Sequence, residues 1–103
     1  MKKLGVLLIC AAGFAIAQPA FASSDLARSK NCMACHAINN KVVGPGFKDV
    51  AKRYAGQQDA EDKLAQKILK GGSGAWGVVP MPANSQVSAE EARELAHWVL
   101  SLK

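Results

Sequence analysis

Two cysteines and a histidine stand close together in the first half of the chain. Cys32 and Cys35 are three positions apart and His36 follows directly, so residues 32–36 read C-x-x-C-H. This pattern is typical of covalent haem attachment. Positions three and four apart lie on one face of a helix, so both thiols and the imidazole could face the same flat ligand. The pattern predicts one haem c, bound through Cys32 and Cys35, with His36 as an iron ligand.

Two other roles for the cysteine pair have less support. A thioredoxin-like oxidoreductase needs a strand, a helix and a strand around its cysteines, whereas the flanking residues are typical of helix and loop. A structural zinc site needs four nitrogen or sulfur ligands, and outside the motif only His97 remains as a histidine. We therefore favour haem over a redox dithiol or a zinc site.

The group that occupies the second axial position of the iron decides whether the protein is an electron carrier or a ligand-binding or catalytic haem protein. Met33 lies between the two cysteines and cannot reach the far side of the haem. Met81 lies between two prolines, which restrict the backbone on either side of it. We predict that His36 and Met81 are the axial ligands. His97 and an open coordination site are the alternatives.

The N-terminal residues have the pattern of a secretory signal peptide. Lys2 and Lys3 precede an apolar run over residues 4–17, and Ala-Phe-Ala follows at residues 20–22. The run of about 14 residues is shorter than the roughly 20 that a membrane-spanning helix needs. We expect cleavage after Ala22, one mature domain at residues 23–103, and a periplasmic location without stable membrane insertion. A retained anchor, or a lipoprotein modified at Cys10, is the alternative.

The rest of the chain predicts a small all-α domain. The 103 residues allow one domain, and a core of this size gains from a bound cofactor. No stretch alternates apolar and polar residues as a strand would. We expect four or five short helices, of which the last opens with a capping box of Ser88 and Glu91. The first helix is expected to run from an N-cap at Ser24 or Asp25 toward Asn31. Three more helices are expected over residues 47–54, over residues 59–70 and from residue 88 to the C-terminus. Loops are expected at residues 39–46 and 71–86.

Four separated motifs, in this order, resemble those of the small bacterial class I c-type cytochromes. They lie at residues 32–36, 43–50, 76–82 and 95–100. The chain resembles in particular the short-chain periplasmic carriers that donate electrons to haem-cd nitrite reductase in denitrification. The resemblance implies the all-α class I cytochrome c fold, with its short helices packed around one covalently attached haem.

The resemblance also implies roles for four residues around the haem. The Pro45 carbonyl would accept the Nδ1 hydrogen of His36. The Trp76 indole would bind a haem propionate, which Lys67 would also face. The Asn84 amide would form a hydrogen bond near the sulfur of the methionine ligand. These positions are therefore candidate cofactor-binding residues.

The function expected from these observations is one-electron transport in the periplasm, without enzymatic activity. The partners would be a nitrite reductase, a terminal oxidase or an upstream quinol-oxidising complex, and we expect a monomer. Residues 23–56 carry six basic and two acidic side chains, which would steer the domain toward acidic partner surfaces. Export argues against nucleic acid as a partner. The steering residues would be Lys30, Lys41, Lys48, Lys52 and Arg53.

Overall fold

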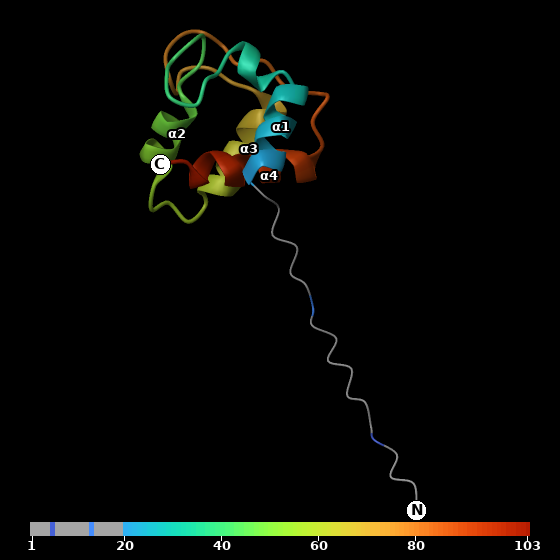
Figure 1. Ribbon diagram of the computed structural model, residues 1–103. Coiled ribbons are helices and arrows are strands. Elements are labelled where there is room, and N and C mark those ends of the chain that lie inside the picture. The colour runs from blue at the N-terminus through green and yellow to red at the C-terminus, as the bar shows by residue number, and fades with distance from the viewer. Residues whose placement is uncertain (1–4, 6–12, 14–19) are drawn as a thin grey trace, which may run out of the picture.

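The computed structural model describes residues 20–103, together with Gly5 and Gly13. Most of the expected signal peptide lies outside the described residues, so its cleavage stays a prediction. The elements are α1 (Ala20–Ser29), the 3-10 turn η1 (Cys32–Ala34), α2 (Phe47–Tyr54), α3 (Ala60–Lys70) and α4 (Ala89–Ser101) (Figure 1). The described residues contain no β-strand beyond two isolated bridges. The expectation of an all-α fold is confirmed.

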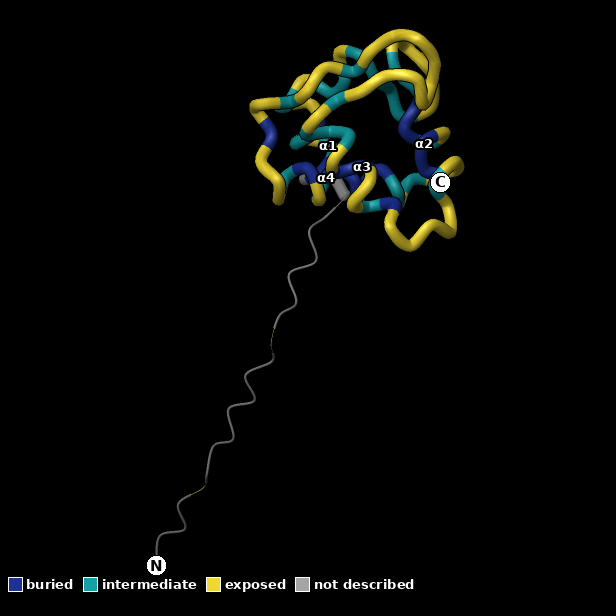
Figure 2. Tube along the Cα trace, turned by 180° about the vertical axis from the view of Figure 1, so that it is seen from behind, coloured by how far each residue is buried: buried dark blue, intermediate teal, exposed yellow. Residues whose placement is uncertain are grey.

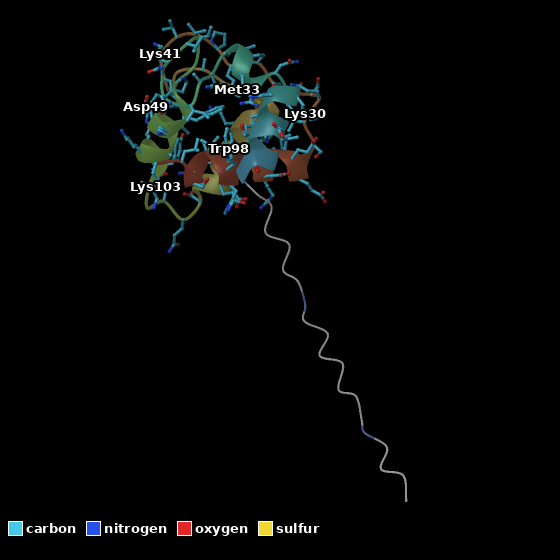
Figure 3. The ribbon with its side chains drawn as sticks, in the orientation of Figure 1. Lys30, Met33, Lys41, Asp49, Trp98 and Lys103 are labelled. Atoms are coloured by element: carbon cyan, nitrogen blue, oxygen red, sulfur yellow. The ribbon has the colours of Figure 1, made fainter. Side chains whose placement is uncertain are left out.

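The C-terminal helix is the centre of the packing, because α4 contacts α1, α2 and α3. Trp98 of α4 lies among the helices (Figure 3) and meets Phe47 of α2 edge to face, with 5.5 Å between ring centroids. The buried residues lie mainly in the helices, whereas the long loops are exposed (Figure 2). The core consists of Ala27, Phe47, Val50, Leu64, Ala65, Val87, Ala92, Leu95, Ala96, Trp98 and Val99.

The start of α4 is fixed by the expected capping box. The Ser88 hydroxyl accepts a hydrogen bond from the Glu91 backbone N–H at 3.1 Å, and the Ser88 N–H donates to the Glu91 carboxylate at 3.0 Å. The Ser88 N–H donates to the Glu91 carboxylate, and the Lys30 Nζ lies 3.3 Å from the Glu91 Oε2. Both hold the pKa of Glu91 below its ordinary value. A lowered carboxyl pKa stabilises the fold at neutral pH, and this contribution is lost as the pH falls through the folded-state pKa.

Replacing Ser88 with alanine should destabilise the domain by removing this cap. We expect the free energy of unfolding to fall by about 1 kcal/mol, as for other N-cap substitutions. Denaturant unfolding of the holoprotein measures the change. Ser85→Ala, an exposed serine in the preceding turn, is the matched control. Equal stability of the two variants would contradict the assigned cap.

The first helix begins earlier than the sequence indicated. The expected N-cap at Ser24 or Asp25 is wrong, because α1 already begins at Ala20. Asp25 lies inside the helix, where its carboxylate pairs with Arg28 at 3.6 Å. Packing of α1 against α4 supplies stability that a local cap does not, so the helix extends beyond the cap suggested by the sequence.

The two expected loops lie together on one side of the helices. The loop after η1 and the glycine-rich loop between α3 and α4 both run along this side (Figure 1), and the view from behind agrees (Figure 2). The helices α2 and α3 begin and end within one residue of the predicted bounds. Two loops that are distant in sequence are therefore held beside one another by a helical core.

Candidate haem-binding site

A cavity of about 490 Å³ lies between the two loops and helices α2, α3 and α4. This volume is within the roughly 300–1,000 Å³ that is typical of small-molecule and cofactor sites. Its walls are largely apolar, with contributions from Leu64, Ile68 and Val99. Six of the eight residues predicted to hold the haem line it, whereas Cys32 and Asn84 do not. The six are Cys35, His36, Pro45, Lys67, Trp76 and Met81.

The imidazole of His36 is held in one orientation by its neighbours. Its Nδ1 lies 2.8 Å from the Pro45 carbonyl oxygen. A carbonyl can only accept, so Nδ1 carries a hydrogen, and in the neutral ring Nε2 then keeps a free lone pair. The ring also stacks on Phe47, with centroids 4.8 Å apart and planes inclined by 22°. The expected Pro45 contact is therefore present, and Nε2 is the atom available to a metal.

Close approach of Gly44 fixes the other side of the imidazole. A Cβ atom built on Gly44 would lie 2.5 Å from His36 Cε1 and 2.9 Å from Nδ1. The ring cannot give way freely, because Phe47 and Pro45 hold it. Only glycine fits this position without displacing the imidazole.

Gly44→Ala should therefore push the His36 ring off the Pro45 carbonyl. We expect a loss of about 1–3 kcal/mol in the free energy of unfolding, the range for overpacked sites. Denaturant titration of the holoprotein measures this loss, and a shifted reduction potential should accompany it because the imidazole has moved. Unchanged stability together with an unchanged potential would show that the ring has room to move.

Cys32 begins the 3-10 turn η1 and Cys35 directly follows that turn, whereas the spacing suggested that both lie on an α-helix. In a 3-10 turn positions three apart are eclipsed, so Cys32 and Cys35 still lie on one side of η1. Cys35 lines the cavity, and Cys32 is half-buried against the core. Burial raises the pKa of the Cys32 thiol, whereas redox-active cysteines need a lowered pKa. The environment of Cys32 therefore argues against a thiol oxidoreductase.

Met81 is tied to the end of α3 by backbone hydrogen bonds. Its N–H donates to the Gly72 carbonyl at 2.8 Å, and its carbonyl accepts from the Gly72 N–H at 3.0 Å. Gly71 has a φ of 70°, and a Cβ on it would collide with the Met81 carbonyl oxygen. This approach needs glycine, both for the positive φ and for space. Met81 thus reaches the cavity from a firmly anchored backbone.

Asn84 lies outside the cavity lining and supports the loop instead. Its Nδ2 donates to the Ile68 carbonyl at 2.9 Å, and its backbone N–H donates to the same oxygen at 3.2 Å. Its Oδ1 accepts a hydrogen bond from Gln86 at 3.0 Å. These bonds fasten the loop after Met81 to α3. The role expected for Asn84 near the methionine sulfur stays a prediction.

Lys67 and Trp76 lie at the cavity as expected, and Trp76 has a partner that the sequence analysis missed. Lys67 is half-buried beside Gly72, on which a Cβ would lie 2.7 Å from the Lys67 Nζ. The Arg53 guanidinium lies 4.2 Å from the centroid of the Trp76 ring. These two residues are distant in sequence, so no local pattern indicates the contact.

His97 faces away from the cavity. Its side chain is 77% exposed, and its Nδ1 lies 3.2 Å from the Glu61 carboxylate. This residue is therefore a surface member of α4, and the alternative in which His97 binds the iron is wrong. Of the described residues that line the cavity, His36 and Met81 are the side chains that carry an imidazole or a thioether. An imidazole, a thioether and an apolar wall fit a haem.

The chain matches the family model described as "Cytochrome c" over residues 22–103. It is 53% identical to cytochrome c-552 of Hydrogenobacter thermophilus over 103 residues and 50% identical to cytochrome c-551 of Pseudomonas aeruginosa over 105, in both cases across the whole of each chain. The crystal structure of wild-type Nitrosomonas europaea cytochrome c552 is 52% identical and has a TM-score of 0.76. The match covers 78% of this chain and 99% of that one.

The comparisons agree with the geometry of the cavity. No helix in the described part of the chain is long and apolar enough to cross a membrane. The family match spans the whole domain, including the C-x-x-C-H motif. The chain belongs to the cytochrome c family, as a small bacterial class I c-type cytochrome that binds haem c covalently and transfers electrons to other proteins rather than acting as an enzyme.

Proposed function

We propose that this cytochrome is a periplasmic one-electron carrier whose haem iron is held by His36 Nε2 and Met81 Sδ. It takes electrons from a quinol-oxidising complex and delivers them to a terminal reductase or oxidase, with the haem-cd nitrite reductase as the leading acceptor. The observation that carries the proposal is the apolar cavity lined by an oriented imidazole and by an anchored methionine.

The two side chains suit electron transfer better than catalysis. The haem supplies an iron that changes oxidation state by one electron. A histidine and methionine pair raises the reduction potential relative to two histidines. His36 and Met81 would fill both axial positions, so no substrate could reach the metal. Leu64, Ile68 and Val99 give the cavity an apolar wall, which disfavours water in the site.

Spectroscopy of the purified protein tests the proposed ligands. The ferric protein should show the weak near-infrared band of sulfur-to-iron charge transfer, and the ferrous protein should resist carbon monoxide. Ready carbon monoxide binding without this band would favour the second candidate function, a gas sensor or enzyme with an open iron site.

The proposed export can be tested by the mass of the mature protein. Expression in a bacterium competent for cytochrome maturation should give a periplasmic product that comprises residues 23–103 plus one haem. A product that retains residues 1–22, or one recovered from the cytoplasm, would contradict the proposal. If the N-terminal segment is instead a retained anchor, the larger mass of the uncleaved chain should be found in the membrane fraction.

An exposed apolar patch around the cavity mouth supports contact with partner proteins. It consists of Val43, Val78 and Val79, which line the cavity and are 49%, 93% and 60% exposed, and of their chain neighbour Val42, which is 56% exposed. Exposed Lys41 directly precedes it, on the outside of the loops (Figure 3). Lys30 does not act as a free surface charge, because its ammonium pairs with Glu91 and donates to the Gln86 carbonyl. We therefore remove Lys30 from the proposed steering residues.

Electron transfer to an acidic partner should slow as salt is added, because added ions screen the attraction between the two surfaces. Stopped-flow kinetics with the purified nitrite reductase measure the second-order rate. Lys41→Gln should reduce the rate at low ionic strength. Lys63→Gln on α3, whose ammonium already pairs with Asp59 at 3.2 Å, should have less effect. Rates that stay flat or rise with salt would contradict steering.

A further inference from the structure

The glycine-rich loop that leads to Met81 has few attachments to the rest of the protein. Residues 73–80 are all exposed, and Gly74 and Gly77 have positive φ values. Within the described chain, the hydrogen bonds of residues 73–80 are the Gly74 to Gly77 turn at 2.9 Å and one bond from Arg53. Arg53 is therefore the hydrogen-bonding link between this exposed stretch and a helix.

Arg53 contacts the loop at two adjacent residues. Its guanidinium lies 4.2 Å from the Trp76 ring centroid, and its Nη1 donates to the Ala75 carbonyl. A planar guanidinium can stack on an aromatic ring while its N–H groups donate hydrogen bonds in the plane of the guanidinium. Ala75 and Trp76 precede Met81 by six and five residues. We call this pair of contacts the Arg53 clasp.

The helix that carries Arg53 also supports the histidine side of the cavity. At the N-terminal end of α2, Phe47 stacks on His36. At its C-terminal end, Arg53 holds the loop that leads to Met81. Val50 and Ala51, between these ends, are buried in the core. One rigid helix of two turns thus contacts both of the segments that carry the proposed axial ligands.

We propose that Arg53 is a positioning residue for Met81: the Arg53 clasp keeps the loop closed over the cavity and so keeps the thioether on the iron. This inference rests on the proposed ligation by Met81. The contacts of Arg53 with this loop are to Ala75 and Trp76, so it would act on Met81 through the loop. Its loss should leave the resting ligand set unchanged and increase the frequency with which Met81 leaves the iron.

Cyanide binding to the ferric holoprotein measures this frequency. Cyanide can bind only after Met81 has left, so the rate at saturating cyanide reports the opening of the loop. We expect Arg53→Ala to raise this limiting rate about tenfold, because a charge-assisted hydrogen bond and a cation–π contact are lost. Lys52→Ala removes the same charge from an exposed neighbour on α2 and should leave the rate at the wild-type value.

A conservative variant separates the geometry of the clasp from its charge. Arg53→Lys keeps the cation but lacks the planar fork, so its limiting rate should lie between those of the wild type and Arg53→Ala. This variant also carries the test if Arg53→Ala does not yield folded holoprotein. A general loss of stability would not raise the limiting cyanide rate while the near-infrared band stays intact.

The outcomes distinguish this inference from the proposed function. If the wild-type ferric protein shows the near-infrared band and the Arg53 variants bind cyanide at the same limiting rate as Lys52→Ala, the clasp is overturned and the ligation stands. If the wild-type protein lacks the band, the ligation by Met81 is overturned and the clasp with it. A selective increase in the Arg53 variants supports the clasp.

Discussion

Replacing Met81 with alanine should lower the reduction potential and open the iron to small ligands. In the proposed ligation the thioether favours ferrous iron, and its loss would leave a site that water or carbon monoxide can enter. We expect the potential to fall on the order of 0.2 V, a fraction of the ~0.8 V range over which axial ligands act. Redox titration measures the shift, and carbon monoxide binding to the reduced protein reports the open position.

The second methionine of the described residues provides the control. Met33 lies in η1 and packs partly buried against the core, so Met33→Ala should cost stability and leave the potential close to that of the wild type. A wild-type potential in Met81→Ala would contradict the ligand assignment. The bridge between Gly72 and Met81 is formed by backbone atoms, so the loop should keep its attachment to α3 in the variant.

Replacing Cys35 with serine should greatly reduce the retention of haem. Cys35 lines the cavity next to His36, and a hydroxyl does not form the thioether bond. We expect less holoprotein from cells competent for cytochrome maturation, because one of the two covalent attachments is missing. Denaturing mass spectrometry and the haem-to-protein ratio measure the effect.

Ala34→Ser is the matched control, because it introduces the same hydroxyl one position earlier at an exposed site. It should leave the haem-to-protein ratio unchanged. The Cys32→Ser, Cys35→Ser double variant should release any bound haem on denaturation. Full covalent haem in Cys35→Ser would show that Cys32 alone suffices for attachment.

The features that could be predicted from the sequence are those that depend on neighbouring residues. The C-x-x-C-H spacing, the Ser88 and Glu91 capping box and the glycine- and proline-rich loop each act over a few positions. Helices α2 and α3 were also predicted closely, because apolar spacing and charged ends agree within each segment. The fold class followed from these local signals together with the family resemblance.

The features that the sequence did not reveal depend on contacts between distant segments. Lys30 pairs with residues 56 or more positions away, so its engagement could not be anticipated. The contact between Arg53 and Trp76 and the early start of α1 likewise depend on tertiary packing. Of the candidate site, the residue types were therefore predictable, whereas which side chains hold one another in place was not.

The bond between His36 and Pro45 has a consequence for the history of this protein. The acceptor is a main-chain oxygen, which every amino acid possesses, so substitution at position 45 need not remove it. What must persist is the path of the backbone there, for which proline's restricted φ is suited. The orientation of the imidazole can therefore survive extensive divergence of nearby side chains, provided that the turn itself is inherited.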